Sequence, residues 1–204
     1  MASEAFEKFR QSMNIGYYEW HDGIGYDLNA LAALPPEDRL PAEDLVIARH
    51  AADWRDVEAL DHIGSDRALH ELKKALLAQS LDARIEAAER LARRKLLDES
   101  AIEKVIVDAL DRTTILDGMV KTLSFATAYP TPAVRSKLLS CALHGNDDIR
   151  VHAAALVHFL YGGSSEPFDW AFRPFYLQFG SEDRDVRRSA YLDLCAKIGV
   201  EPRE

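Results

Sequence analysis

The chain has 204 residues, of which 48% are hydrophobic and 29% are charged, a balance typical of a folded globular protein. Its formal net charge of −9 argues against a nucleic-acid-binding protein, because clustered Lys and Arg supply most of the affinity for phosphates. A basic partner fits this charge better, although acidic surfaces are as common in proteins that bind nothing charged. With two cysteines, no apolar run of about 20 residues and no export signal, the sequence predicts a cytoplasmic protein without disulfides or a membrane segment.

Residues 1–53 do not repeat, and we expect them to form an N-terminal helical cap. The stretch "SEAFEKFRQSM" predicts a helix that buries Phe6, Phe9 and Met13. Asp27 is placed to cap a helix over "LNALAAL", and "LPPEDRLP" predicts a turn before the next helix. A terminal helical repeat exposes an apolar face unless an atypical segment covers it, which gives these residues a structural task.

The most unusual part of this region is "YYEWHDGIGYDL", residues 17–28. Three interpretations compete: a plug that seals an apolar end, a binding loop that presents Trp20 and the tyrosines, and a metal or catalytic cluster built on His21 and Asp22. We favour the plug, because large aromatic rings with polar tips suit the end of a helical stack.

Residues 54–204 read as a series of short helices without a convincing strand pattern. Apolar residues recur at helical spacing in "DRALHELKKALLAQ" and "SAIEKVIVDAL", so each of these helices needs a neighbour to cover its apolar face. Similar phrases recur at intervals of roughly 30 residues, typical of an α-solenoid with two helices in each unit. These phrases begin at Asp56, Arg84, Asp117, Arg150 and Arg187.

The repeats resemble the HEAT-repeat family, in which an Asp, a branched residue, an Arg and an Ala-rich helix recur. The best copies are "DDIRVHAAALVHFLYG" and "DRDVRRSAYLDLCAKIG", whereas the unit around Asp117 lacks the Arg. The resemblance implies one continuous all-α solenoid over residues 54–204. It also implies that aspartates and arginines form a hydrogen-bonded ladder between repeats, with Asp82, Arg84, Asp148, Arg150, Asp185 and Arg187 in these positions.

The sequence offers no convincing catalytic, cofactor or metal site. No two of its seven histidines have the helical spacing of a ligand pair, and His70 in a single His-Glu dipeptide lacks the further pairs of the HEAT-like deoxyhypusine hydroxylases. Cys141 and Cys195 lie among residues that read as helix core, so we expect both thiols to be inert. The glycine pairs lack a phosphate-binding pattern and read as turns.

Binding through a surface therefore remains the best functional interpretation. In HEAT-like stacks the second helix of each unit lines a concave face, and equivalent positions of the phrases would project from it. The early half of this face looks acidic, although helix faces in contact with solvent are charged in most proteins. The partner-binding residues that we expect are Glu58, Asp61, Glu86, Glu89, Arg93 and His152, together with Trp20 if residues 17–28 are a binding loop.

A second aromatic stretch, "SSEPFDWAFRPFYLQFG" over residues 164–180, lengthens the interval before the last repeat. Aromatic residues are enriched at interfaces, but a long insertion also needs them for its own core. We expect most of these rings to be buried, with Trp170 and Tyr176 the ones that show a polar edge.

Taken together, these patterns favour a non-enzymatic HEAT-like module that binds another protein. A small acidic repeat protein of this kind is similar to bacterial immunity proteins, which would imply a basic toxin as its partner. The alternative is an enzyme or lyase on the same scaffold, similar to the HEAT-like phycobilin lyases or DNA glycosylases, with the aromatic N-terminal segment at its site.

Overall fold

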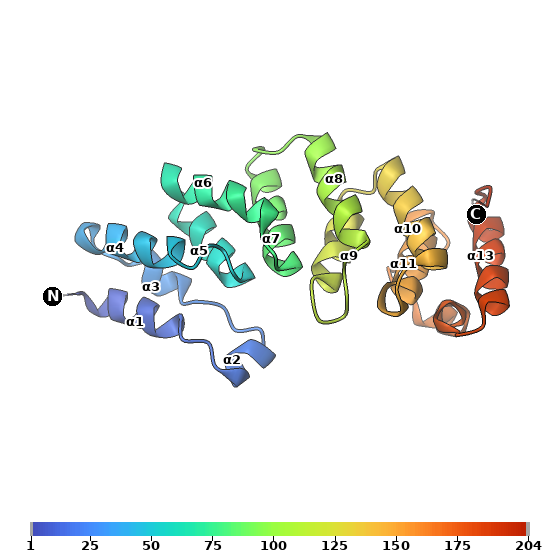
Figure 1. The fold of residues 1–204 in the computed structure, drawn as a ribbon, viewed down its shortest axis with the longest axis horizontal. Coiled ribbons are helices and arrows are strands. Elements are labelled where there is room, and N and C mark those ends of the chain that lie inside the picture. The colour runs from blue at the N-terminus through green and yellow to red at the C-terminus, as the bar shows by residue number, and fades with distance from the viewer. Residues whose placement is uncertain (1, 203–204) are drawn as a thin grey trace. The chain divides into compact units, whose positions relative to one another are not determined.

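The computed structural model describes residues 2–202, and all regular elements in that range are helical (Figure 1). The prediction of an all-α protein is confirmed for these residues, in which Thr114 makes only isolated bridges to Asp117 and Gly118. The chain divides into two compact units, of which unit 1 ends at Leu96 and unit 2 begins at Leu97. Within residues 2–202 no helix has the length and apolar character needed to cross a membrane.

Unit 1 joins the non-repeating N-terminal residues to the first helices of the repeats. Its elements are α1 (Glu4–Ser12), α2 (Tyr17–His21), α3 (Leu28–Ala32), α4 (Pro36–Ile47), α5 (Trp54–Ile63), α6 (Asp66–Lys74), the 3-10 helix η1 (Ala75–Leu77) and α7 (Leu81–Arg93). Helix α5 packs against α3, α4, α6 and α7, so the boundary expected at residue 53 falls inside this unit. Phe9, Leu31, Val46 and Leu60 are buried in its core.

Local capping residues set the start of several helices, as the sequence indicates. The Asp27 carboxylate accepts a hydrogen bond from the Ala30 N–H at 2.8 Å, as predicted.

The turn expected at residues 34–41 is wrong, because α4 begins at Pro36 and contains Pro41. Pro36 stands in the first turn of the helix, where its missing N–H has no intrahelical partner to lose, so this proline starts the helix.

Unit 2 consists of longer helices followed by a short irregular segment and a final helix. Its elements are α8 (Glu99–Leu110), α9 (Met119–Ala128), α10 (Pro132–His144), α11 (Asp147–Leu160), η2 (Trp170–Phe172), α12 (Arg173–Tyr176), η3 (Leu177–Gly180) and α13 (Arg184–Ile198). Helices α10 and α11 form the most extensive helix pair, α8 packs on α10, and α13 packs on α10, α11 and η3. Leu138, Leu156, Phe179 and Leu194 are buried between them.

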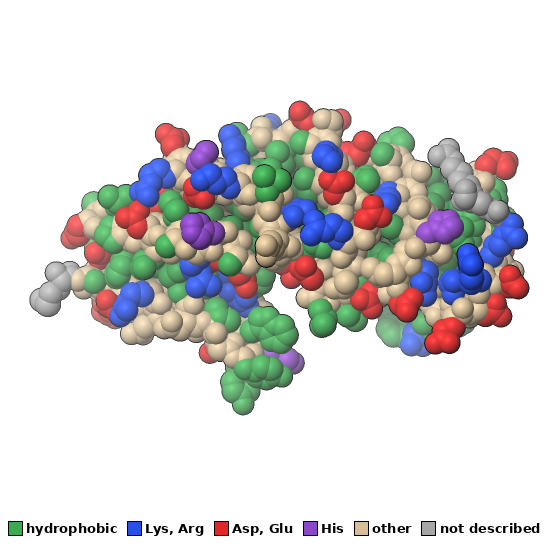
Figure 2. Space-filling model, viewed as in Figure 1, with side chains coloured by type: hydrophobic (Ala, Val, Ile, Leu, Met, Phe, Trp, Pro, Cys, Tyr) green, Lys and Arg blue, Asp and Glu red, His purple; other side chains and the backbone are tan. Residues whose placement is uncertain are grey.

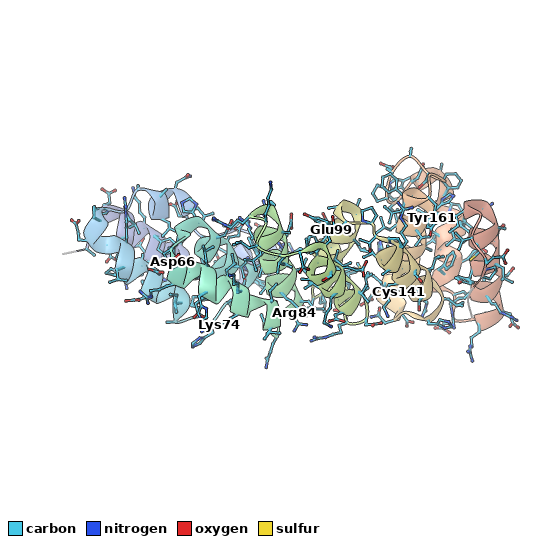
Figure 3. All side chains as sticks on the ribbon, turned by 90° about the horizontal axis from the view of Figure 1, so that it is seen from above. Asp66, Lys74, Arg84, Glu99, Cys141 and Tyr161 are labelled. Carbon is cyan, nitrogen blue, oxygen red and sulfur yellow. The ribbon has the colours of Figure 1, made fainter. Side chains whose placement is uncertain are left out.

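Arginines near the start of several helices bind backbone carbonyls rather than the aspartates expected from the ladder. Arg84, labelled in Figure 3, donates from Nη2 to the Ala78 carbonyl oxygen at 2.6 Å. Arg187 donates from Nη1 to the Ser181 carbonyl oxygen at 2.6 Å. Each guanidinium therefore satisfies a carbonyl that precedes its own helix.

Arg150 follows the same pattern, donating to the Gly145 carbonyl oxygen at 3.1 Å and to the Phe179 carbonyl oxygen at 2.9 Å. Its ion pair, at 2.7 Å, is with Asp147 and not with the expected Asp148. The Asp148 carboxylate instead accepts a hydrogen bond from the Ile115 N–H at 3.0 Å. Arg84, Arg150, Arg187 and Asp148 thus make contacts within the fold, but their partners differ from those of the expected ladder.

The aromatic stretch at residues 164–180 packs against α11 and α13 in unit 2. Phe179 is buried as expected, and Trp170 is exposed. Tyr176 is fully buried, so the expectation of an exposed polar edge is wrong for this residue. The reason is an internal partner, because its hydroxyl is hydrogen-bonded to Nδ1 of His158 at 2.9 Å.

Candidate functional site

The most exposed aromatic surface of unit 1 is the segment around α2. The side chains of Tyr17, Tyr18 and Trp20 are 69%, 77% and 59% exposed, and Ile24 beside them is half exposed. We call these four residues the aromatic lobe. Figure 2 shows hydrophobic side chains gathered on the projecting segment that Figure 1 labels α2. The plug interpretation is therefore wrong for Trp20 and its two tyrosine neighbours.

The rings of the lobe contact one another instead of an apolar core. The Tyr17 ring lies 5.8 Å from the Tyr18 ring and 6.3 Å from the Trp20 ring, measured between centroids. His21 lies 5.8 Å from Tyr17 on the same helix. Such ring pairs prefer edge-on and tilted arrangements, so the cluster presents one shaped apolar surface to solvent.

Local backbone interactions fix the shape of this segment. The Glu19 carboxylate accepts a hydrogen bond from the Gly16 N–H at 3.0 Å, which closes the first turn of α2. After the helix, Gly23 has a φ of 65°, a left-handed conformation that glycine adopts without the strain of a side chain. The "GIG" stretch is thus a turn, as predicted.

A buried arginine of α5 holds the segment in place. Arg55 is 1% exposed and donates to the carbonyl oxygens of Ile24, at 2.6 Å, and Glu19, at 3.2 Å. A third hydrogen bond, at 2.9 Å, joins its guanidinium to the Asp53 carboxylate. The guanidinium also lies over the Trp54 ring, with its central carbon 4.5 Å from the ring centroid. A charged donor with this many partners fixes both ends of the turn to the core.

The cap interpretation holds for Tyr26, at the end of the same sequence stretch. Tyr26 is buried, and its hydroxyl donates to the Asp56 carboxylate at 2.7 Å. Arg49 donates to the same carboxylate oxygen at 2.6 Å. Burial, together with the hydrogen bond to Asp56, raises the pKa of Tyr26 well above its ordinary value. The stretch therefore ends in a core residue, although it begins with exposed ones.

The predicted acidic residues of α5 and α7 converge on Arg90 of α7. The Arg90 guanidinium bonds to Glu86 at 2.6 Å and to Asp61 at 3.2 Å, and it also pairs with Glu58. Arg94 adds a further bond to Asp61. We call Glu58, Asp61, Glu86 and Arg90 the Arg90 cluster. Arg90 and Arg94 offset two of these three negative charges, so the expected acidic face is weaker than the sequence indicates.

The aromatic lobe and the Arg90 cluster border each other. A Cβ atom added to Gly25 would lie 3.4 Å from a carboxylate oxygen of Glu58 and 3.7 Å from the Trp54 ring. The turn after α2 thus packs directly beside the cluster. Ile24 of the lobe, the neighbour of Gly25, and Glu58 of the cluster therefore belong to one region of unit 1.

The other residues expected to bind a partner are buried, or lie on other surfaces than the aromatic lobe. Glu86 is only 5% exposed, because Arg90 holds it inside the unit, so it offers little surface to a partner. Glu89 is half-buried and Arg93 is exposed on α7. His152 belongs to unit 2, where its ring lies 5.5 Å from Phe168, and burial lowers its pKa.

The titratable groups singled out in the sequence do not form a catalytic or metal-binding arrangement. His21 is hydrogen-bonded to its neighbour Asp22 at 2.9 Å on an exposed surface. Within residues 2–202, no group of three or more His, Cys, Asp or Glu side chains is arranged to hold a metal ion. Cys141 and Cys195 are both buried, and burial raises the pKa of each thiol.

Sequence reasoning missed the two arginines that organise the site. Glu86 and Arg90 have the i, i+4 spacing of a helical ion pair, which indicates part of the Arg90 cluster. Arg55 gives no such signal, because its main partners are carbonyl oxygens 31 and 36 residues away. Comparison with family models, with curated proteins and with solved structures finds no match to this chain.

Proposed function

We propose that this protein is a non-enzymatic module that binds another protein through the aromatic lobe. The observation that carries the proposal is that Tyr17, Tyr18 and Trp20 are exposed while Arg55 holds the backbone beneath them. Large aromatic rings left together in water mark interaction surfaces, and Tyr and Trp are the residues that most often dominate binding energy. A rigid backbone lowers the entropy lost on association.

The chemistry of the surface suggests the kind of partner that it binds. The rings require an apolar pocket, and their hydroxyl and indole groups favour a pocket with polar edges. The negative charge of the chain favours a partner with a basic surface around that pocket. Because Arg90 and Arg94 already pair with the nearby carboxylates, this attraction arises from the overall charge more than from Glu58 or Asp61.

The scaffold of this module is, in the same proposal, a HEAT-like solenoid. The solenoid is supported by a hydrogen bond that recurs in each unit. In each case an arginine in the first turns of a helix donates to a carbonyl oxygen just before that helix. Arg84 does so in unit 1. Arg135, Arg150 and Arg187 do so in unit 2. A role as an immunity protein that masks a basic toxin is the narrower form of the proposal, and it rests on size, charge and layout.

Affinity capture with substituted proteins tests the proposed function. Wild-type protein, Trp20→Ala and Leu77→Ala are immobilised and incubated with lysate of the source organism, and captured proteins are identified by mass spectrometry. Leu77 is the matched control, because its side chain is 84% exposed in unit 1 but lies outside the lobe. We expect a partner that wild-type protein and Leu77→Ala retain and that Trp20→Ala loses.

A titration with the purified partner then measures how much binding free energy each variant loses. Trp20→Ala should weaken the complex by about 2 kcal/mol, as for a central aromatic contact, and change the free energy of unfolding by less than about 0.5 kcal/mol. Equal capture by all three proteins would show that the lobe is not the binding surface. Higher salt should slow association if the partner is basic.

A further inference from the structure

A groove runs between α10 and α13 of unit 2, on helices that contact each other directly. It consists of two adjoining hollows of about 740 Å³ and about 540 Å³, and His144 lines both of them. Tyr161, labelled in Figure 3, lies at the end of α11 and lines the larger hollow. The two hollows differ in chemistry, since the larger carries apolar and aromatic side chains and the smaller is basic.

The basic hollow gathers four arginines in a chain whose net charge is −9. They are Arg150, Arg184, Arg187 and Arg188; Asp185 also lines the hollow, and Asp147 forms an ion pair with Arg150 at 2.7 Å. Basic side chains and a histidine gather on this part of unit 2 in Figure 2. A cluster of guanidinium groups around one hollow attracts carboxylate or phosphate groups, which the fork of an arginine can bind in pairs.

Two of these arginines are held in fixed positions. The carbonyl oxygens of Gly145 and Phe179 orient Arg150, and those of Ser181 and Glu182 orient Arg187. Arg184 and Arg188 are exposed on the first turns of α13. Arg150 and Arg187 are therefore oriented before a ligand binds, which lowers the cost of ordering the site.

The larger hollow supplies apolar contact beside these charges. Pro130, Leu139, Tyr161 and Tyr191 line it. The Arg135 guanidinium lies over the Tyr161 ring, 5.1 Å from its centroid, which keeps this ring oriented. An occupant of the whole groove therefore needs anionic groups at one end and an apolar group at the other.

We propose that the groove between α10 and α13 binds an acidic peptide segment of a partner protein, with carboxylates on the arginines and an apolar side chain beside Tyr161. Charge complementarity selects an anionic ligand. Glu201, which lines the larger hollow, is exposed and disfavours a long polyanion that would fill both hollows. A nucleic acid requires a longer basic track than one hollow offers, whereas a short peptide places its charges in that hollow alone. This site is independent of the aromatic lobe, which belongs to unit 1.

Fluorescence anisotropy with two labelled probes tests the proposal on the full chain. One probe is a short oligoglutamate, and the other is the same peptide with a tryptophan at one end. We expect saturable binding of both at physiological ionic strength, with the tryptophan probe bound more tightly. Substituting Ser140→Glu, which places a carboxylate in the larger hollow, should remove this advantage.

The decisive variant is the double substitution Arg184→Glu and Arg188→Glu, which should weaken binding of oligoglutamate about tenfold or more. Glutamate at position 184 is compatible with folding, because negative charge is favourable near a helix N-terminus. The control is Arg112→Glu with Arg173→Glu, which makes the same change in charge at exposed residues of unit 2 outside the groove. Circular dichroism and the unfolding midpoint verify that both variants fold.

Three results would overturn the proposal. The first is the absence of saturable binding by the wild-type protein. The second is equal weakening by the two double variants, which would indicate attraction by overall charge and not by the groove. The third is tighter binding of single-stranded oligothymidylate than of either peptide, lost in the Arg184 and Arg188 variant, which would assign the groove to nucleic acid.

Discussion

The hydroxyl of Tyr176 and Nδ1 of His158 lie 2.9 Å apart, and both side chains are buried in unit 2. This hydrogen bond joins α11 to the irregular segment before α13. The rings of Phe172 and Phe175 pack around His158, at centroid distances of 4.8 Å and 6.4 Å. The bond therefore lies among aromatic rings, with the Ser164 side chain beside Tyr176, and the loss of one partner leaves the other without a replacement from water.

Tyr176→Phe should lower the free energy of unfolding by about 1–3 kcal/mol, because it leaves the His158 nitrogen buried and unpaired. Urea denaturation followed by circular dichroism measures the change. Tyr18→Phe removes the same hydroxyl from an exposed ring and should change the free energy by less than about 0.5 kcal/mol. Similar values for the two variants would contradict the structural role of the bond.

The stability of the protein should fall on mild acidification. Burial, together with the charge of Lys197, lowers the pKa of His158 below its ordinary value of 6.5, and Asp169 opposes this shift. A histidine whose pKa is lowered in the folded state binds a proton more readily when the chain is unfolded. Its contribution to the free energy of unfolding is therefore complete above pH 6.5 and is lost as the pH falls through the folded pKa. Burial lowers the pKa of His152 in the same direction.

The free energy of unfolding, measured between about pH 7.5 and pH 5, checks this prediction. We expect it to decrease toward acid, and the slope to become smaller in His158→Gln and in His152→Gln. His70→Gln provides the control at an exposed histidine. An unchanged slope in both the His158 and His152 variants would show that other groups cause the acid sensitivity.

Arg55→Met should destabilise unit 1 by about 3 kcal/mol, because the carbonyls of Glu19 and Ile24 lose a buried charged donor. It should also free the lobe, so chymotrypsin should cleave after Tyr17, Tyr18 or Trp20 faster than in the wild-type protein. Arg94→Met is the matched control, because Arg94 also bonds to a carboxylate and a carbonyl, both of Asp61, but is exposed. Its cost should stay below about 1 kcal/mol.

Neither cysteine should react readily in the folded protein. Burial raises the pKa of the Cys141 thiol to about 11 and raises that of Cys195, so the reactive thiolate is scarce at neutral pH. Titration with a chromogenic disulfide reagent should detect both thiols in denaturant and almost none without it. Rapid reaction of a native thiol would show that its helix opens locally.

Features that depend on neighbouring residues could be predicted from the sequence. The cap formed by Asp27, the buried faces of α6 and α8 and the helical setting of both cysteines follow from residue type and spacing over one or two turns. The start of α4 at Pro36 could not be predicted, because proline is equally suited to a turn and to the first turn of a helix.

The candidate site depends on contacts that spacing does not reveal. Aromatic content alone could not show that Trp20 is exposed whereas Tyr26 is buried, because this difference depends on Asp56 accepting the Tyr26 hydroxyl. In the same way, the acidic residues of α5 and α7 read as a charged surface until Arg90 is placed between them. Both outcomes depend on partners about 30 residues away in the chain.

The way in which Arg55 holds the lobe has a consequence for how the proposed binding surface can evolve. Arg55 contacts the backbone carbonyls of Glu19 and Ile24, not the side chains of the aromatic residues between them. Substitutions at Tyr17, Tyr18 or Trp20 therefore leave the turn intact while they alter the surface that it displays. Changes at these positions can therefore alter the proposed binding surface while Arg55 keeps its contacts with the backbone.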